Sequence, residues 1–595
     1  MRKSSFLFIL YFACLRTVLA QTLPSSRTVD WSMAGCRGTL PAVLPQWDVT
    51  QYGLVNDAVT DNSAALNNLI STSGGNLRVL YFPAGSYRFT TTVYTNDSLV
   101  LRGAGSDSTR FLFDFGGNSG DGITCSGSAN SAWLPVTYGY RRGSDRIVAT
   151  GASALQPGQW LEIRQQNGSW DTQPVSWADY SVGQLMEVVS VQGDTLFLSE
   201  PLRIDYDSAL NVEVSTFTPA RQVHIECLSF QRTDSASCFC PALNFRHAVD
   251  CSVRGVEGLK SISAHLLLDA SSHITVTGSY FHDAYEYNGS SMHGYGIALI
   301  NHTGSSLIED NILKHLRHSF SLQTGANGNV IAYNYSLDPN RSEFPANFGA
   351  DISMHGHFPY ANLFEGNIVQ NIQLDQTWGP SGPLNTFFRN RAELYGILMT
   401  SGTVNSDTQN FVGNEVTGTA AFQGNYSLAG SGHFEFGNNI RGTITPAGTG
   451  TLNDISCYRT ALPLFWNITQ QWPSIGFPNG AGSGTIPARE RYLSSGEKTL
   501  CGPQSSTGTS ALNMSSGIRV YPNPVQSGET VRISIDRSKS NFWELQELTG
   551  RLIRHSDCRE SQMIEIPTTG MPAGIYLLRI FNDDGYASER ILLTE

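Results

Sequence analysis

The sequence predicts an all-β protein organised around a solenoid of repeating coils, and three observations support this fold class. An apolar-x-x-Asn element between residues 307 and 440 returns at steps of 23, 33, 23, 24 and 24 residues, at Asn311, Asn334, Asn367, Asn390, Asn414 and Asn438. The 58 glycines and the low charged fraction of 15% suit a turn-rich β chain. A chain of 595 residues is also too long for one compact core.

The N-terminus has the order of a cleavable signal peptide. Residues 1–20 place Arg2 and Lys3 before an apolar run at 6–12 and end in Thr17-Val-Leu-Ala20. The apolar run is too short to span a bilayer, and no later stretch is long and apolar enough for a transmembrane helix. We therefore expect an exported protein without a transmembrane segment, with a retained N-terminal anchor as the alternative.

The net charge argues against nucleic acid as a partner. The formal charge is -12, and loss of residues 1–20 removes Arg2, Lys3 and Arg16 and no acids, which makes it -15. Nucleic-acid backbones bind basic surfaces, so a chain this acidic is a poor candidate. An anionic substrate stays open, because a local cluster of Arg and His can oppose the overall sign.

Residues 21–144 are expected to form an N-terminal cap and the first coils. An acidic turn ending at Asp61 precedes 63–70, which predicts a capped helix, and apolar runs at 79–82 and 99–101 predict short strands. With 47–53, these segments resemble in order and spacing the pectate-lyase-like superfamily, in its rhamnogalacturonase and epimerase-like branch. The resemblance implies a right-handed parallel β-helix that opens with a capping helix. It leaves the chemistry open, because the superfamily holds lyases, hydrolases, epimerases and non-enzymes.

Residues 145–223 are expected to form a small β module inserted into the β-helix, because apolar residues alternate there around Gly-Asp turns. Trp160, Trp170 and Trp177 are expected in its core, with a sugar-stacking face as the alternative. The main β-helix then resumes over 224–445. Its repeated asparagines are expected to bond to their equivalents in neighbouring coils as a structural ladder.

The cysteines suit an exported protein. Of ten cysteines Cys14 falls in the signal peptide, and the nine that remain leave at least one thiol unpaired. Cys227 and Cys251 are one period apart, so we expect stacked neighbours about 4.8 Å apart that are either disulfide-bonded or free buried thiols. Cys457 and Cys501 are further disulfide candidates in a C-terminal cap. Zinc binding by Cys238-Phe-Cys240 is an alternative whose spacing matches no standard pattern.

The C-terminal region loses the period. Residues 446–504 are expected to form a C-terminal cap, 505–516 a linker, and 517–595 a small β-sandwich. This last segment, with Val520-Tyr-Pro-Asn-Pro-Val525 and Gly574-Ile-Tyr576, resembles the type A C-terminal sorting domain of the type IX secretion system in Bacteroidota. The resemblance implies the type IX secretion machinery as a partner, export through the periplasm, and either attachment to the cell surface or removal of the domain.

Two insertions mark where a site is expected. Residues 285–296 precede Asn311 and residues 338–357 precede Asn367, so both should rise from the same side of the coils and wall a groove. His318 and Asp351 each lie 16 residues before a ladder asparagine and should stack, and so should His315 and Asp338. The predicted catalytic residues are His318, Asp351, His355 and Arg317, and the predicted substrate-binding residues are Arg341, His357, His315, Asp338, Arg389, Arg391 and Tyr360.

This Arg- and His-rich groove favours a polysaccharide lyase acting on a uronate-containing polymer. β-Elimination needs a group that neutralises the carboxylate (Arg317, Arg341 or a bound Ca²⁺), a base (His318 or His355) and an acid (Tyr335 or Tyr360). A glycoside hydrolase on the same scaffold would need two flanking carboxyl groups, and the sequence shows no adjacent Asp-Asp pair in this region. A non-enzymatic, carbohydrate-binding or adhesive β-helix is the third hypothesis.

Overall fold

The structure is a computed structural model that describes residues 22–38, 44–72, 77–95, 97–501, 519–521, 525–534, 542–547, 552–557, 563–582 and 585–594. The predicted signal peptide at 1–20 and the predicted linker at 505–516 lie outside these residues. The chain forms two compact units, one that ends at Cys501 and one that holds the C-terminal strands. No helix among the described residues is long and apolar enough to cross a membrane.

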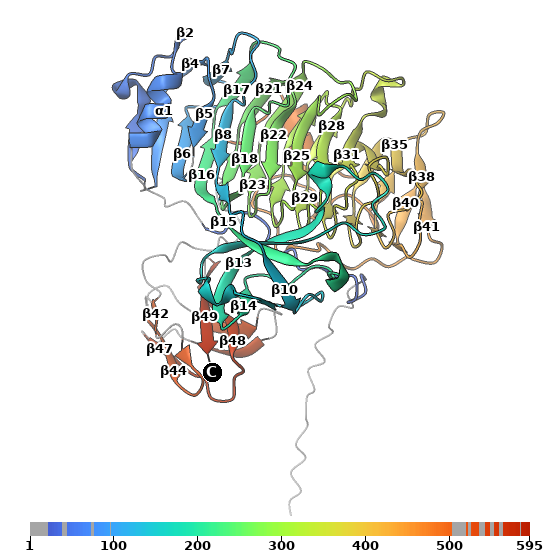
Figure 1. The fold of residues 1–595 in the computed structure, drawn as a ribbon. Helices are drawn as coiled ribbons and strands as arrows, with labels where there is room; N and C mark the ends of the chain where they lie inside the picture. Colours follow the sequence, from blue (N-terminus) through green and yellow to red (C-terminus); the bar gives the residue numbers. More distant parts are fainter. Residues whose placement is uncertain are drawn as a thin grey trace, which may run out of the picture. The chain divides into compact units, whose positions relative to one another are not determined.

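The first unit is a right-handed parallel β-helix whose coils build three parallel ladders (Figure 1). Ladder 1 contains β1 (Gln46–Asp48), β3 (Arg78–Phe82), β6 (Asp97–Gly103), β16 (Ala220–Glu226), β20 (Ser252–Arg254), β23 (Thr275–Thr277), β26 (Leu307–Glu309), β29 (Val330–Ala332), β32 (Leu363–Glu365), β34 (Thr386–Phe388), β36 (Asn410–Val412) and β39 (Phe434–Phe436). Ladder 2 contains β2 (Asp57–Asp61), β4 (Gly85–Phe89), β7 (Thr109–Phe113), β17 (Ser229–Arg232), β21 (Glu257–Ser261), β24 (Tyr280–Ala284), β27 (Ile312–Lys314), β30 (Tyr335–Leu337), β33 (Ile368–Leu374), β35 (Arg391–Met399), β37 (Glu415–Val416) and β40 (Asn438–Ile440). Ladder 3 contains β5 (Val93–Thr95), β8 (Ile123–Ser126), β18 (Leu243–Arg246), β22 (Ala264–Asp269), β25 (Tyr295–Ile300), β28 (His318–Leu322), β31 (Ala350–Met354), the later parts of β33 and β35, and β38 (Asn425–Ser427).

The core consists of inward-pointing side chains that stack from coil to coil, because neighbouring coils have nearly the same length. The rings of Phe364 and Phe387 stack with centroids 4.8 Å apart, and those of Phe387 and Phe411 with centroids 5.1 Å apart. These residues are direct register partners on β32, β34 and β36. Each coil alone exposes an apolar inner face, so stacking the coils buries one continuous core.

The predicted asparagine ladder is confirmed. Between ladders 1 and 2 the side-chain amide of Asn334 donates to Asn367 Oδ1 over 3.0 Å, and Asn367 donates to Asn390 Oδ1 over 2.9 Å. The same side chains bond to main-chain groups of the preceding coil, as when Asn367 donates to the Ile331 carbonyl over 2.8 Å. The buried turn is thereby satisfied without water.

A second ladder, which sequence reasoning missed, stabilises the corner that leads back to ladder 1. Asn329 donates to Asn362, and Asn362 to Asn385, each over 3.0 Å, and Asn385 donates to Gln409 over 2.9 Å. Each member lies five residues before an asparagine of the first ladder. This constant offset of five residues in the sequence could have predicted the second ladder.

The N-terminal end is covered by the predicted capped helix, α1 (Ser63–Thr72). The amide of Ser63 donates to Asp61 Oδ1 over 3.0 Å, and Thr90 donates through its hydroxyl to Asp61 Oδ2 over 2.6 Å. Burial opposes ionisation of Asp61, but these hydrogen bonds outweigh it and lower its pKa to about 2. Asp61 therefore joins the helix to the neighbouring coil.

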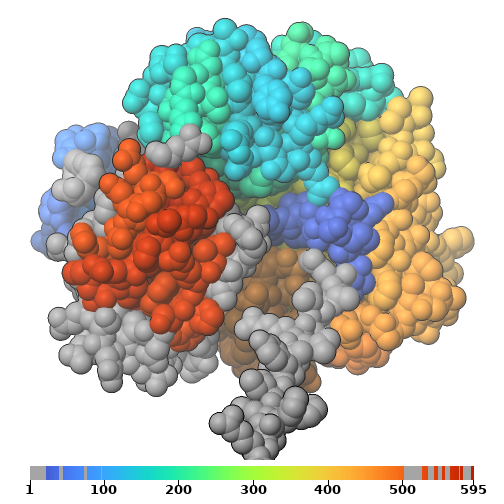
Figure 2. Space-filling model, turned by 90° about the horizontal axis from the view of Figure 1, so that it is seen from below, coloured from blue at the N-terminus to red at the C-terminus, as the bar shows by residue number. Residues whose placement is uncertain are grey.

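The inserted β module is an antiparallel sheet that leaves the β-helix after β8 and returns at β16. Its strands are β9 (Ser128–Ala129), β10 (Leu134–Tyr138), β11 (Arg146–Ala149), β12 (Trp160–Gln165), β13 (Val182–Gln192), β14 (Thr195–Leu198) and β15 (Glu213–Thr218), so it starts before residue 145. Trp160 is fully buried. In Figure 2 the blue-green module forms a lobe beside the dark-blue N-terminal segment, whose Thr28 carbonyl accepts from Arg142 over 2.6 Å.

Residues 446–501, which the sequence predicts as a C-terminal cap, run back along the coils from Glu415, which accepts from the Gly476 amide, to Gly278, and we call them the strap. The strap covers apolar side chains that point outward from ladders 1 and 2, using Leu452, Trp466 and Ile486 among others. Its helix α2 (Pro487–Leu493) carries Arg491, which pairs with Asp310 at 2.8 Å. Near its end the amide of Leu500 donates to the Gly278 carbonyl over 2.8 Å.

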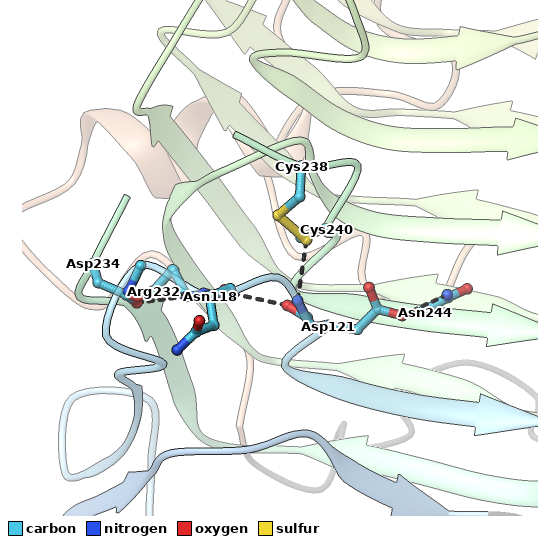
Figure 3. The surroundings of a disulfide bond; sticks show 9 residues. Asn118, Asp121, Arg232, Asp234, Cys238, Cys240 and Asn244 are labelled. Carbon is cyan, nitrogen blue, oxygen red and sulfur yellow. Dashed lines mark hydrogen bonds and ion pairs between the residues drawn. A yellow bond between two sulfur atoms is a disulfide. The ribbon is translucent and has the colours of Figure 1, made fainter. Parts of the chain in front are cut away.

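The predicted stacking of Cys227 on Cys251 is wrong, and both are free thiols. Glu226 pairs with Arg254, so this coil is 28 residues long and offsets the two cysteines. The extra length comes from the loop between β17 and β18, where Cys238 and Cys240 form a disulfide instead of a zinc site (Figure 3). Cys457 and Cys501 are also free, so they are not paired with each other.

The second unit is a β-sandwich. One sheet contains β42 (Arg519–Tyr521), β44 (Thr530–Ser534) and β47 (Met563–Pro567), and the other contains β43 (Val525–Gln526), β45 (Phe542–Glu547), β46 (Leu552–Asp557), β48 (Gly574–Asn582) and β49 (Gly585–Thr594). Ile533 and Ile566 of the first sheet share a core with Trp543 and Leu578 of the second. Alternation of apolar residues thus predicted this unit correctly.

Replacing Asn367 by alanine should destabilise the β-helix. The change removes the acceptor of the main-chain and side-chain N–H groups of Asn334, and it removes the side-chain donor to the Ile331 carbonyl. We therefore expect a loss of about 3 kcal/mol in the free energy of unfolding. Denaturant titration followed by circular dichroism measures it, with the exposed Asn68→Ala on α1 as control. Equal unfolding midpoints for both variants would contradict a stabilising ladder.

Candidate functional site

Both insertions leave the β-helix at the same corner, between ladders 2 and 3. Residues 285–294 connect β24 to β25, and residues 338–349 connect β30 to β31. They meet across the intervening coil, where the Gly289 amide donates to Glu343 Oε1 over 3.0 Å and the Ser342 amide donates to the Tyr287 carbonyl over 3.2 Å. The corner therefore carries a joined rim along the edge of ladder 3.

A cluster of polar rings lies next to this rim, outside the main core. Tyr295 begins β25 and His318 begins β28, and their ring centroids are 4.8 Å apart. His355 follows β31, with its ring 5.4 Å from His318. The Arg317 guanidinium lies 5.7 Å from the Tyr295 ring. We call Tyr295, Arg317, His318, His355 and Asp375 the His318 cluster.

His318 is held as a neutral imidazole. Its Nδ1 lies 3.1 Å from the Ala350 carbonyl, which assigns the proton to Nδ1, and Nε2 has no hydrogen-bond partner among the described residues. Burial first, and then the charges of Arg317 and His355, hold the pKa of His318 well below its ordinary value of 6.5. The ring thus presents a buried acceptor.

His355 is oriented by Asp375. Its Nδ1 lies 3.2 Å from Asp375 Oδ2, and the other carboxylate oxygen accepts from the Thr377 amide over 2.8 Å. Burial would raise the pKa of Asp375, but the hydrogen bond and charge of His355, with the bonds from Thr377, hold it well below its usual range. Nε2 of His355 is left to exchange a proton, and its side chain is 15% exposed.

The prediction that Asp351 stacks on His318 is wrong by one residue. His318 pairs with Ala350, because the loop at 355–362 is one residue longer than its equivalent at 323–329. Asp351 instead accepts from Ser336 Oγ over 2.5 Å and from the amides of Gln370 and Asn371 over 2.9 and 2.7 Å. Its buried carboxyl thereby links β30 and β33 at the corner between ladders 2 and 3, and it is not part of the His318 cluster.

His315 and Asp338 stack as predicted, with His315 Nδ1 2.8 Å from Asp338 Oδ2, but they are not part of the His318 cluster. They lie toward ladder 2, where His315, Lys260 and His282 line a cavity of about 370 Å³. The insertion at 285–294 contacts both places, because Tyr287 packs edge-on against His315 while the Ser291 carbonyl accepts from Arg317 over 3.3 Å.

Three predicted substrate-binding residues have structural contacts instead. The Tyr360 hydroxyl donates to the Gly183 carbonyl over 2.6 Å and anchors the inserted module. Arg389 donates to the Asp454 carbonyl over 2.7 Å, and the fully buried Arg391 pairs with Glu415 at 2.6 Å, so both serve the strap side. The position of a residue within the repeat does not show which face of the coils the strap covers, so these contacts could not be predicted from the sequence.

Two more predicted residues lie near the cluster without joining it. Arg341 donates to the Pro345 carbonyl over 3.1 Å and shapes the insertion at 338–349. His357 is buried, and burial lowers its pKa to about 4. Tyr335, an alternative acid, packs against Tyr492 of the strap.

The calcium alternative finds no ligand set in the described part of the chain. No group of three or more His, Cys, Asp and Glu side chains converges there to hold a metal ion. Tyr295 and Asp375 are not among the catalytic and substrate-binding residues that the sequence predicts. These two residues lie close to His318 and His355 in space, and this proximity can be recognised only in the folded chain.

The chain has the pectate-lyase-like signature at its N-terminal end. Residues 46–131 match the family described as rhamnogalacturonase A/epimerase, pectate lyase-like. Residues 519–594 match the secretion system C-terminal sorting domain, and this type IX sorting domain indicates secretion and attachment to the cell surface. The comparison with curated proteins gave no match.

Solved structures similar to this chain share little sequence with it. Tailspike gp61 of Pseudomonas phage phi297 is 14% identical over 67% of this chain and 75% of its own, with a TM-score of 0.48. The A-module of the Azotobacter vinelandii mannuronan C-5 epimerase AlgE4 is 13% identical over 65% and 95%, with a TM-score of 0.34. The GH87 alpha-1,3-glucanase of Streptomyces thermodiastaticus is 12% identical over 70% and 68%, with a TM-score of 0.37.

Asp351→Asn should change how stability depends on pH. Burial, only partly offset by the hydrogen bonds from Ser336, Asn371 and Gln370, raises the pKa of Asp351 to about 6 from an ordinary 3.8. The folded state therefore resists ionisation, and this group lowers stability as pH rises from about 4 to about 6, by roughly 3 kcal/mol in total. Asparagine cannot ionise and keeps an acceptor for the two amides.

The free energy of unfolding of the Asp351→Asn variant, relative to the unchanged protein, should therefore increase between pH 4 and pH 7. Urea titrations across this range measure it. The exposed Asp97→Asn provides the matched control. A difference that stays constant with pH would mean that Asp351 ionises as readily in the folded chain as in the unfolded one.

Proposed function

We propose that this protein is a polysaccharide lyase that cleaves a uronate-containing polysaccharide by β-elimination at the His318 cluster. The observation that carries the proposal is the convergence of a guanidinium (Arg317), a phenol (Tyr295) and a carboxylate-oriented imidazole (His355 with Asp375) within one cluster. Elimination requires these three kinds of group together.

Arg317 would bind the uronate carboxylate. Its positive charge makes the proton on the neighbouring carbon easier to remove, because charge that develops on the carboxylate in the transition state is neutralised. Arg317 is positioned for this by its own backbone, whose amide donates to the Gly294 carbonyl over 2.7 Å, and by the Ser291 carbonyl.

His355 would accept that proton. With Nδ1–H directed to Asp375, the lone pair of Nε2 is available, and the ionised Asp375 stabilises the imidazolium that forms. The C–H bond breaks, a carbon–carbon double bond forms, and the bond to the glycosidic oxygen breaks. Neutral His318 lies beside His355 and adds no charge that would oppose its protonation.

Tyr295 would protonate the leaving oxygen. Burial raises the pKa of Tyr295 to about 12 against the opposing charge of Arg317, so the phenol carries its proton throughout the neutral range. A hydrolase mechanism is less supported, since two carboxyl groups must flank the scissile bond. Asp375 is bonded to His355, and Asp351 is bonded inside the corner.

Substitutions in the cluster should slow cleavage strongly without unfolding the protein. We expect kcat/KM to fall by roughly 10³ for His355→Ala and by about 10² for Tyr295→Phe, and by about 10² to 10³ for Arg317→Ala. Ultraviolet absorbance of unsaturated uronates, released from pectate, alginate or glycosaminoglycans, measures the rate. His555→Ala on the exposed face of the second unit is the control.

Other outcomes separate the competing mechanisms. New reducing ends without the unsaturated product would indicate a hydrolase, and deuterium uptake from heavy water without cleavage would indicate epimerisation through the same proton abstraction. Glycan binding without either reaction, unchanged in His355→Ala, would leave a non-enzymatic surface protein and contradict the proposal.

A further inference from the structure

The tryptophans near the His318 cluster differ in what covers them. Trp160 is buried in the inserted module, and Trp170 packs on Phe358 with ring centroids 4.5 Å apart. Trp177, from the same module, is 58% exposed, and Trp378, on the loop after β33, is 38% exposed. Large aromatic side chains left in solvent commonly mark binding surfaces.

Trp177 and Trp378 flank one residue, His357. The Trp177 ring stands edge-on to His357 with centroids 4.9 Å apart, and the Trp378 ring lies 6.2 Å away at an interplanar angle of 30°. The His357 amide donates to the Trp378 carbonyl over 2.9 Å. Gly356 permits this approach, because its φ of +73° is left-handed and a Cβ there would meet that carbonyl oxygen at 2.6 Å.

The same short segments carry the pair His355 and Asp375. His357 follows His355 by two residues, and Trp378 follows Asp375 by three. The Thr377 amide donates to Asp375 over 2.8 Å, so the carboxylate that orients His355 also shapes the turn that presents Trp378. Trp378 therefore lies on the same loop as Asp375 of the cluster, and Trp177 reaches this region through its contact with His357.

We propose that Trp177 and Trp378 form a sugar-stacking subsite that binds the polysaccharide next to the bond positioned at His355. The apolar face of a pyranose ring can cover an indole that would otherwise contact water, while its hydroxyls stay solvated. The inserted module thus contributes directly to substrate recognition. This inference rests on the proposed function, since it places the same polymer.

Kinetics with long and short oligosaccharides of the cleaved polymer tests the subsite. Trp177→Ala and Trp378→Ala should each raise KM for the long oligosaccharide on the order of tenfold, equivalent to about 1.4 kcal/mol, and leave kcat largely unchanged. The Phe variants should restore part of the affinity. Tyr94→Ala, which removes a 62% exposed aromatic ring on β5, is the control.

Direct binding separates this proposal from the lyase assignment. Tryptophan fluorescence titration measures the binding of uronate oligosaccharides. Binding that both Ala variants weaken, in a protein that cleaves none of the oligosaccharides, would overturn the lyase assignment and retain the subsite. Cleavage with an unchanged KM in both variants would overturn the subsite and retain the lyase. Failure of the protein to bind or cleave any polymer tested would overturn both.

A second inference comes from Cys227 and Cys501. Cys227 Sγ lies 3.1 Å from the Cys501 carbonyl, and Cys501 Sγ lies 3.1 Å from the carbonyl of Gly255, the residue beyond Arg254 in the adjoining coil. The neighbouring Cys501 side chain, and then burial, hold the pKa of Cys227 well above its usual range. Cys501 ends the strap, and Cys227 directly follows strand β16 of ladder 1.

We infer that Cys227 and Cys501 form a disulfide in the exported protein, replacing the pairings expected from spacing. Two S–H bonds break and one S–S bond forms, and a protein or small-molecule disulfide of the oxidising compartment takes the two electrons and two protons and becomes a dithiol. The bond would fasten the end of the strap to the β-helix.

Peptide mass mapping of the exported protein tests this, after alkylation without reduction. We expect a cross-linked peptide containing Cys227 and Cys501, which reduction separates and which Cys501→Ser abolishes. The Cys238–Cys240 bond is the internal control. Quantitative alkylation of Cys227 and Cys501 in a sample where Cys238 and Cys240 stay protected would overturn the inference.

Discussion

Hydrogen bonding between identical side chains in successive coils is the constraint on which this architecture depends. The amide of Asn334 reaches Asn367, and that of Asn367 reaches Asn390, only if every coil returns to the same height with the same register. A buried amide without its partner costs about 1 to 3 kcal/mol. The two insertions at 285–294 and 338–349 lie at the corner between ladders 2 and 3, which neither asparagine ladder uses. The candidate site lies next to this corner, where long loops do not interrupt either asparagine ladder.

Different segments of the chain cover the outward faces of the three ladders. The strap covers ladders 1 and 2 and recruits Arg389 and Arg391 as structural cations, while the inserted module docks through Tyr360. The edge of ladder 3 next to the two insertions carries the His318 cluster. The strap and the inserted module thus bury apolar surface that a solenoid cannot bury alone, and the proposed site lies on another face of the coils.

Burial gives the cluster its chemical character. It keeps His318 neutral and Tyr295 protonated, whereas Asp375 remains ionised because His355 and Thr377 satisfy it. These opposite protonation states of neighbouring groups would separate the proposed roles of base, acid and orienting carboxylate. The exposed Trp177 and Trp378 border this arrangement, so recognition and chemistry would share one surface.

The sequence alone predicted a solenoid of repeating coils, a capped helix and the asparagine ladder, because periodicity and turn chemistry are local properties of the chain. Its resemblance to known families implied the parallel β-helix and the sorting domain. The sequence also located the corner of the insertions and named Arg317, His318 and His355. The pairing of His318 with Ala350 instead of Asp351, and the offset of Cys227 from Cys251, could be seen only in the folded chain. One added residue in a loop shifts the register, and in a strand a shift of one residue turns a side chain to the opposite face.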